Sequence, residues 1–233
     1  MSNRFDDFSR VPRTPTTARP LLGITVLIVE DSRYACEAVR LKCQKCDARI
    51  RRAASFKAAL RHLSCYRPSV VIADMGLPDG SGVDLIGKLA QTRGRDMVLL
   101  GTSANDEAAK AFEQAGADGF LPKPIPSISA FQHAILSHMP PELQPVGLRP
   151  VDNEGVTPDK TAYHDDLLHI AKVIKKDPED VHQYAVHFLA GLARLSNDPE
   201  LLEHIRTDTQ FDRNVVLNMI DQRIQASSPP EAL

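Results

Sequence analysis

The chain has 233 residues, of which 42% are apolar and 25% charged; this composition excludes a fibrous or wholly disordered protein and is enough for one or two domains. No apolar run reaches the ~18–20 residues of a membrane-spanning helix, and the N-terminal residues lack the apolar core of a secretory signal, so we expect a cytoplasmic protein. The formal net charge of −2 is unevenly distributed: residues 1–149 carry 20 Lys and Arg against 15 Asp and Glu, whereas residues 150–233 carry 8 against 15. The acidic C-terminal third is poorly suited to binding nucleic acid, because the phosphate backbone is also negatively charged.

Two proline-rich stretches divide the chain. Residues 1–23 are rich in Arg, Thr and Pro and are predicted to be a disordered, mildly basic tail. Prolines recur from Pro140 to Pro158, which interrupts any regular element, and we interpret residues 139–156 as a linker. The sequence thus predicts one domain over residues 24–138 and a second over 157–228.

Strand and helix patterns alternate in the first domain. Continuous apolar, β-branched runs predict strands covered on both faces, and helical spacing of apolar residues follows each of them. Strands are predicted over 25–29, 49–53, 69–73, 97–100 and 119–121, helices over 32–46, 55–65, 82–91, 107–115 and 127–138, and a loop over 75–82. Five such repeats predict an α/β domain with a doubly wound, five-stranded parallel sheet.

The second domain shows only helical patterns. Thr157-Pro158, Asp177-Pro178 and Asp198-Pro199 each place a capping side chain before a proline, which is a signal for the start of a helix. Helices are predicted over about 158–176, 178–196, 199–207 and 212–226. We therefore expect a small all-α bundle.

The cysteines do not suggest a metal site or disulfides. Cys43 and Cys46 form a CxxC pair, but no second pair follows at the spacing of a zinc site, and Cys36 and Cys65 stand alone. In a cytoplasmic protein we expect reduced structural thiols.

Polar residues gather where the predicted strands end. Glu30 and Asp31 follow the first strand, Asp74 the third, Thr102 and Ser103 the fourth, and Lys123 the fifth. Ligands of such sheets bind beyond the carboxyl ends of the strands. Three clustered carboxylates need a compensating positive charge, and Mg²⁺, which prefers oxygen ligands, can supply it. A carboxylate in this setting can also act as a nucleophile towards phosphorus.

These motifs resemble the receiver domains of two-component response regulators. The resemblance rests on the segments 26–32, 70–82, 103–104 and 116–124 and covers about residues 24–138. It implies a flavodoxin-like fold and no enzymatic turnover beyond self-catalysed phosphorylation and dephosphorylation. It also implies a phosphoryl donor that is a histidine kinase or a phosphotransfer protein.

The resemblance also implies residue roles. Asp74 would be the phosphoacceptor, and Lys123 would contact the phosphoryl oxygens. Glu30, Asp31, Asp74 and the carbonyl of Gly76 would hold Mg²⁺, while Phe120 would be the aromatic switch residue. The switch hydroxyl would be that of Ser103, with Thr102 as the competing candidate.

The resemblance does not extend to the helical domain. Its charge disfavours DNA binding, and His169 with Lys172 matches a phosphotransfer motif only in part, because Val173 stands where glycine is usual; His164, His182 and His187 lie in no motif. We expect a protein-interaction or dimerisation module, and no membrane partner. The alternative is a transcriptional regulator with an unrecognised helical DNA-binding output.

Overall fold

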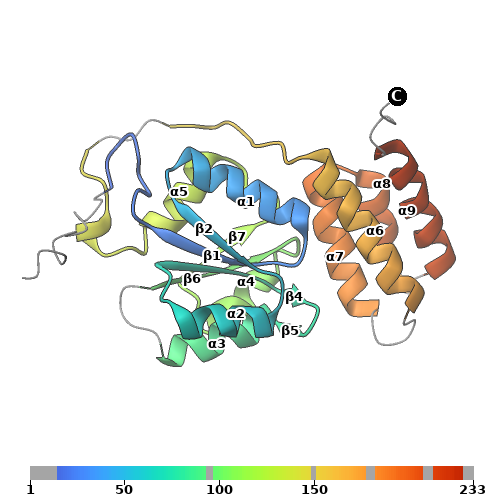
Figure 1. Ribbon diagram of the computed structural model, residues 1–233, viewed down its shortest axis with the longest axis horizontal. Helices are drawn as coiled ribbons and strands as arrows, with labels where there is room; N and C mark the ends of the chain where they lie inside the picture. Colours follow the sequence, from blue (N-terminus) through green and yellow to red (C-terminus); the bar gives the residue numbers. More distant parts are fainter. Residues whose placement is uncertain (1–14, 93–96, 148–150, 177–181, 207–211, 228–233) are drawn as a thin grey trace, which may run out of the picture.

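The computed structural model describes residues 15–92, 97–147, 151–176, 182–206 and 212–227. A five-stranded parallel sheet in the order β2-β1-β3-β6-β7 forms the centre of the N-terminal part (Figure 1). Its strands are β1 (Thr25–Val29), β2 (Arg49–Ala53), β3 (Val70–Asp74), β6 (Val98–Ser103) and β7 (Gly119–Pro122). This confirms the predicted doubly wound sheet.

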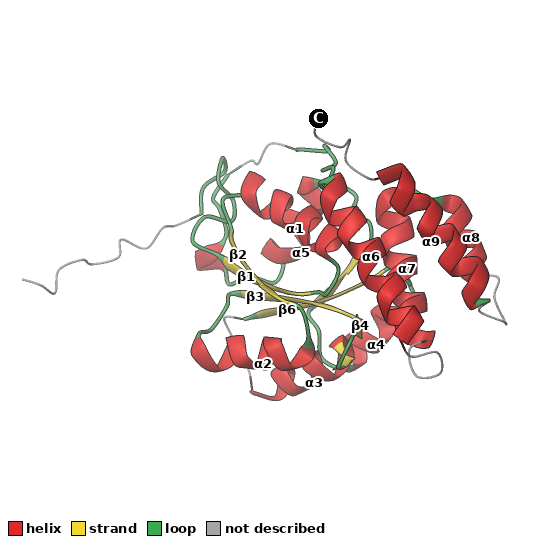
Figure 2. Cartoon of the chain, turned by 45° about the vertical axis from the view of Figure 1, so that its right-hand side comes forward, coloured by secondary structure: helices red, strands yellow, loops and turns green. Residues whose placement is uncertain are grey.

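Helices cover both faces of the sheet (Figure 2). On one face lie α1 (Arg33–Lys45) and α5 (Ile128–Leu136); on the other lie α2 (Phe56–Cys65), α3 (Gly82–Thr92) and α4 (Ala108–Gln114). Serines start three of these helices: the hydroxyls of Ser32, Ser55 and Ser127 accept from the amides of Ala35, Ala58 and Ala130, as helix N-caps do.

Alternation along the strands builds the two apolar layers. Val26 and Ile28 of β1 pack with α1 and α5, whereas Leu27 and Val29 pack with the opposite layer. All four are nearly inaccessible to solvent. Because successive side chains of a strand point to opposite faces, a sheet covered twice needs these uninterrupted apolar runs.

The connection after β1 leads to β2 on one side, and β3 lies on the other side of β1. A crevice therefore opens beyond the carboxyl ends of β1 and β3, which is where ligands of such sheets bind.

The C-terminal part is helical, as predicted. It contains α6 (Lys160–Lys176), α7 (His182–Ser196), α8 (Pro199–Arg206) and α9 (Arg213–Ser227). Its apolar core gathers residues of all four helices, including Leu167, Leu189, Leu201 and Ile220. Tyr34 of α1 also belongs to this core, so the two parts pack against each other.

Some predicted elements need correction. The expected loop at 75–82 contains a two-stranded hairpin of β4 (Gly76–Leu77) and β5 (Gly80–Ser81), and the linker contains a 3₁₀ turn, η1 (Pro141–Leu143). The first C-terminal helix begins at Lys160 rather than Pro158, because Asp159 caps it through the amide of Thr161. Pro178 lies outside the described residues.

The N-terminal segment also departs from expectation. Its described part, from residue 15, is not a free tail: Leu21 is fully buried in the core of the sheet domain, and its amide donates to the carbonyl of Cys46. Leu21 stands in a short apolar stretch between a Pro-, Thr- and Arg-rich segment and the first strand, which is too short to show a periodic signal, so the sequence pattern missed this contact. Residues 1–14 lie outside the described part.

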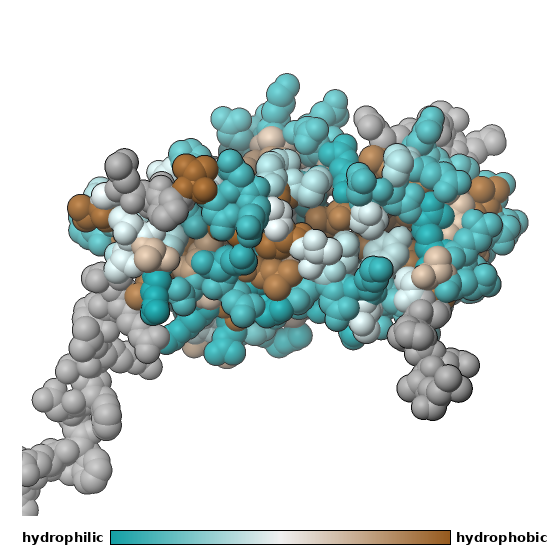
Figure 3. Space-filling model, turned by 90° about the horizontal axis from the view of Figure 1, so that it is seen from above, coloured by the Kyte–Doolittle hydropathy of each residue, from teal (hydrophilic) through white to brown (hydrophobic). Residues whose placement is uncertain are grey.

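The face seen in Figure 3 is mostly hydrophilic, with hydrophobic patches near its centre. Within the described residues, no helix combines the length and apolar character needed to cross a membrane. The cysteines of this part are free thiols, three of them buried.

Candidate functional site

The predicted site residues from three strands come together at the crevice. The Nζ atom of Lys123 lies 2.5 Å from Oε2 of Glu30 and 2.7 Å from Oδ1 of Asp74. Carboxylate oxygens of Glu30, Asp31 and Asp74 lie within 4.8 Å of one another. Because β1, β3 and β7 run parallel, residues far apart in sequence end at the same edge.

Charge in this cluster is incompletely balanced. Burial raises the pKa of Glu30 to about 8, and the nearby Asp74 carboxylate adds to the rise. Burial also raises the pKa of Asp31 to about 6. Burial alone would lower the pKa of Lys123, but Asp74 and Glu30 together raise it above its usual range. One ammonium thus faces three carboxylates, so the site favours an additional cation.

The donor set fits Mg²⁺. Glu30, Asp31 and Asp74 offer oxygen atoms at a spacing that one small cation can share, and Mg²⁺ prefers one or two carboxylates together with waters and phosphoryl oxygens. Gly76 begins β4, two residues beyond Asp74.

A close backbone approach shapes the loop beneath the cluster. A Cβ atom at Gly82 would lie 1.9 Å from the carbonyl oxygen of Asp74, so only glycine allows the start of α3 to fold back against the end of β3. The amide of Gly82 donates to the carbonyl of Met75. This packing fixes the backbone that carries Asp74.

The two candidate hydroxyls make different contacts. Oγ1 of Thr102 donates to the carbonyl of Leu121 at 2.7 Å, which ties β6 to β7. Oγ of Ser103 accepts from the amide of Asn105 at 3.0 Å and so keeps its own proton available for donation. The contacts therefore favour Ser103 as the switch hydroxyl.

Phe120 lies on β7, and its ring centre is 6.0 Å from that of Phe112 on α4. It is partly exposed and packs against the apolar core on the α2–α4 face of the sheet. Its role as a switch stays a prediction.

The side chain of Gln132, on the neighbouring helix α5, is buried and does not face solvent. Its amide group donates to Sγ of Cys46.

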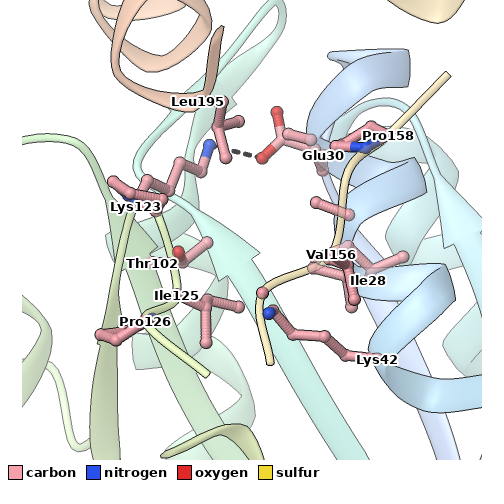
Figure 4. Close-up of a pocket in the computed structure, with 15 residues that line it drawn as sticks. Ile28, Glu30, Lys42, Thr102, Lys123, Ile125, Pro126, Val156, Pro158 and Leu195 are labelled. Carbon is pink, nitrogen blue, oxygen red and sulfur yellow. Dashed lines mark hydrogen bonds and ion pairs between the residues drawn. The ribbon is translucent and has the colours of Figure 1, made fainter. Parts of the chain in front are cut away.

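A cavity of about 190 Å³ adjoins the cluster (Figure 4). Glu30 and Lys123 face each other at one end of it, near Leu195 of α7, and Lys42 of α1 lies at the other. The segment Gly155–Pro158 closes one side. The cavity is mostly apolar and extends the site beneath the segment that leads to α6.

The structure also brings residues of the helical domain to the site, which sequence reasoning missed. The hydroxyl of Tyr184 on α7 donates to Oδ2 of Asp31, and His187 lies against Gly76. Tyr184 falls on an ordinary amphipathic helix, so no local signal marks it.

Comparisons with known proteins agree with this geometry. A model of the response regulator receiver domain family matches residues 26–135. The KDP operon transcriptional regulatory protein KdpE of Escherichia coli is 28% identical over 179 residues, covering 76% of this chain and 75% of that protein. Response regulator MprA of Mycolicibacterium vanbaalenii is 28% identical over 125 residues, covering 52% of this chain and 54% of that protein. The chain thus spans about half the length of that relative.

Solved receiver structures are also similar. The receiver domain (CheY-like) from Methylobacillus flagellatus is 24% identical, with a TM-score of 0.45 over 49% of this chain and 98% of that one. Response regulator TrrA of Thermotoga maritima, solved with Mg²⁺ and beryllofluoride, is 21% identical, with a TM-score of 0.40 over 43% of this chain and 86% of that one. From its family match and its homology to KdpE and MprA, residues 26–135 of this chain form a receiver domain of two-component response regulators.

Proposed function

We propose that this chain is a cytoplasmic response regulator that accepts a phosphoryl group on Asp74, with Mg²⁺, from a histidine kinase or a phosphotransfer protein. It signals through its helical domain, which binds a protein partner or a second copy of the chain. The single observation that carries the proposal is the contact of Lys123 with both Glu30 and Asp74 beside Asp31. Beyond self-catalysed phosphorylation and dephosphorylation, no enzymatic turnover is assigned.

The chemistry follows from the cluster. An Oδ atom of Asp74 attacks the phosphorus, the bond from phosphorus to the donor's nitrogen breaks, and an acyl phosphate forms on Asp74. Lys123 already touches Asp74, so its ammonium is placed to stabilise charge on the phosphoryl oxygens. The Ser103 hydroxyl would donate to one of these oxygens. Glu30, Asp31, Asp74 and the carbonyl of Gly76 would hold Mg²⁺, which neutralises charge on the transferred group.

Phosphoryl incorporation tests the proposal. The full chain, incubated with Mg²⁺ and a small phosphodonor such as phosphoramidate, should gain the mass of one phosphoryl group. Asp74→Asn should abolish the gain, because an amide is not a nucleophile towards phosphorus. Asp84→Asn, which changes an exposed carboxylate on the neighbouring helix α3, should leave it intact.

Equal labelling of Asp74→Asn and the unchanged chain would show that the acceptor is misassigned. Loss of the gain on removal of Mg²⁺ with a chelator, and its return on adding Mg²⁺ back, would support the metal assignment.

The alternative is a DNA-binding output, and the similarity to KdpE, a transcriptional regulatory protein, supports it. The excess of 15 Asp and Glu over 8 Lys and Arg in residues 150–233 opposes it. A salt-sensitive gel shift of genomic DNA fragments by the full chain, with Mg²⁺ and beryllofluoride, would support the alternative over a protein-interaction output.

A further inference from the structure

Lys42 on α1 is a buried lysine at the end of the cavity that lies away from the acidic site. It is only 2% exposed, and its side chain extends from α1 into the cavity (Figure 4). A lysine usually lays its apolar stem on the protein and keeps its ammonium group in water. Lys42 instead holds the ammonium inside the protein, where a charge is costly unless an opposite charge compensates it.

The structure does not provide that opposite charge. Within the described residues, no ion pair or hydrogen bond engages the Lys42 ammonium. Burial lowers the pKa of this group, and the more distant Cys46 and Asp152 offset the effect only in part. An anion inside the cavity would stabilise the charged form of Lys42.

The other polar side chains of the cavity are already bonded. Glu30 and Lys123 pair with each other at the far end, and the hydroxyl of Thr102 donates to the carbonyl of Leu121. An anion at that end would meet the Glu30 carboxylate. The Lys42 end therefore carries the positive charge that is free to pair with a ligand, and charge-assisted hydrogen bonds of this kind are strong.

The walls between the two ends are apolar. Ile28, Val39 and Ile125 line the cavity, and each of them is at most 9% exposed. Val156, from the segment before α6, lines it as well. A free phosphate or sulfate carries several charged oxygens, for which these walls offer no donors. Apolar walls with one cationic group are typical of a site for an organic anion.

The segment that closes the cavity is fixed to both neighbouring helices. The amide of Ser129 on α5 donates to the carbonyl of Asp152 at 3.0 Å, and the amide of Asp152 donates to Oγ of Ser129 at 2.8 Å. Glu154 pairs with Lys45 of α1 at 3.3 Å. These contacts hold the segment across α1 and α5, so the cavity has a wall on this side as well.

The volume of the cavity limits the size of the occupant. It is about 190 Å³, which is below the ~300–1,000 Å³ of sites for drug-sized ligands. An apolar cavity of ~150 Å³ is enough to bind benzene. One small ring or one branched chain with a carboxylate therefore fits, whereas a nucleotide or a lipid is too large.

We infer that this cavity binds a small apolar monocarboxylate, whose carboxylate pairs with Lys42 and whose apolar body packs against Ile28, Val39 and Ile125. The inference goes beyond the proposed function, because it assigns a ligand to the end of the cavity that takes no part in phosphoryl transfer. Binding requires neither Mg²⁺ nor a phosphodonor, so it holds or fails independently of the role of Asp74.

Benzoate and 3-methylbutanoate are the probes that test the inference. They are added to the full chain without Mg²⁺, and binding is followed by methyl NMR. We expect saturable shifts of the methyl signals of Ile28, Val39 and Ile125. Benzamide, which has the shape of benzoate without its charge, should bind at least about tenfold more weakly, because it cannot form the charge-assisted hydrogen bond.

Variants of two lining residues separate the charge from the space. Lys42→Met removes the ammonium and keeps an unbranched side chain in its place; it should weaken benzoate binding at least about tenfold and remove the preference over benzamide. Ala38→Leu narrows the cavity and should abolish binding of both compounds with Lys42 still present. Lys57→Met, which changes an exposed lysine of α2 on the opposite face of the sheet, is the matched control and should bind benzoate like the unchanged chain.

The inference is overturned if neither carboxylate causes a saturable shift up to about 10 mM, a range that covers a ligand of this size with ordinary efficiency. Equal benzoate affinity in Lys42→Met and the unchanged chain would overturn it too, as would shifts confined to methyl groups outside the cavity. Phosphoryl uptake by Asp74 is measured separately, so its failure would count against the proposed function alone.

Discussion

The receiver domain and the helical domain distribute their buried polar groups differently. Within the described residues, eight buried polar or charged side chains lie in the receiver domain, and five of them are candidate site residues: Glu30, Asp74, Thr102, Ser103 and Lys123. In α6–α9 the buried polar residue is Asp166, and its carboxylate bonds to the receiver domain. The receiver domain gathers most of its buried polar side chains at the candidate site, whereas the buried polar side chain of α6–α9 within the described residues contacts the receiver domain.

Core truncations provide the largest test of this comparison. Phe112→Ala in the receiver domain and Leu189→Ala in the helical domain each remove a fully buried side chain. We expect losses of about 3–5 and about 2–5 kcal/mol respectively in the free energy of unfolding, measured by urea denaturation. Because Tyr34 packs into the helical core, Leu189→Ala should also raise hydrogen exchange at the start of α1; unchanged exchange there would argue against shared packing.

Two capping serines separate a local contact from an interdomain one. Ser127→Ala removes only the cap of α5 and should cost about 1 kcal/mol. Ser32→Ala removes the cap of α1 and the bond to the Asp166 carboxylate, so it should cost about 2–3 kcal/mol. Equal losses in thermal or urea unfolding would mean that the bond to Asp166 contributes nothing to stability.

The pair of Asp198 and Arg223 is a polar contact inside the helical domain. Asp198 also caps α8 through the amide of Leu201, and Asp198→Ala should cost about 2 kcal/mol. The exposed Asp221 on α9 supplies the control Asp221→Ala, which should cost much less.

The same pair predicts a pH dependence. The hydrogen bond from Arg223 lowers the pKa of Asp198 below its ordinary value of 3.8. A lowered pKa stabilises the folded state above the pKa of the unfolded chain, and this contribution is lost as the pH falls through the folded value. Acid unfolding curves of the unchanged chain and Asp198→Ala should therefore converge below pH ~4.

The smallest effect concerns the rim of the interface. Arg33 bonds Asp165 at 2.5 Å, but its side chain is 62% exposed. Arg33→Ala should change the free energy of unfolding by less than about 1 kcal/mol, and the difference should disappear in high salt. A larger, salt-independent loss would show that this pair is part of the interface core.

Sequence patterns predicted the sheet well because its physical requirements are local. Strands covered on both faces must be apolar at every position, as in the run from Val70 to Ala73, and the polar site residues must follow at strand ends. The short hairpin of β4 and β5 escaped prediction because two residues are too few to show alternation. Leu21 escaped it because a single anchoring residue has no period.

The docking of the two domains could not be predicted from these patterns. Tyr184 lies on an ordinary amphipathic helix, and Asp166 stands beside the apolar Leu167 like many residues at the edge of a helix stripe. Only the folded arrangement brings them to Asp31 and Ser32, more than 130 positions earlier in the chain. The sequence pointed to the candidate site residues, whereas the contacts that the helical domain makes with them depend on long-range packing.

Asp166 on α6 accepts hydrogen bonds from the Ser32 hydroxyl and from the amides of Arg33 and Tyr34 at the start of α1, and this contact has a consequence in mass action. Both partners belong to one chain, so each meets the other at an effective concentration that the covalent connection sets and that dilution does not change. If the intrinsic dissociation constant of the contact were roughly equal to this effective concentration, the docked and undocked forms would be about equally populated. The fraction of docked chains is therefore independent of the total protein concentration, unlike that of a contact between two separate chains.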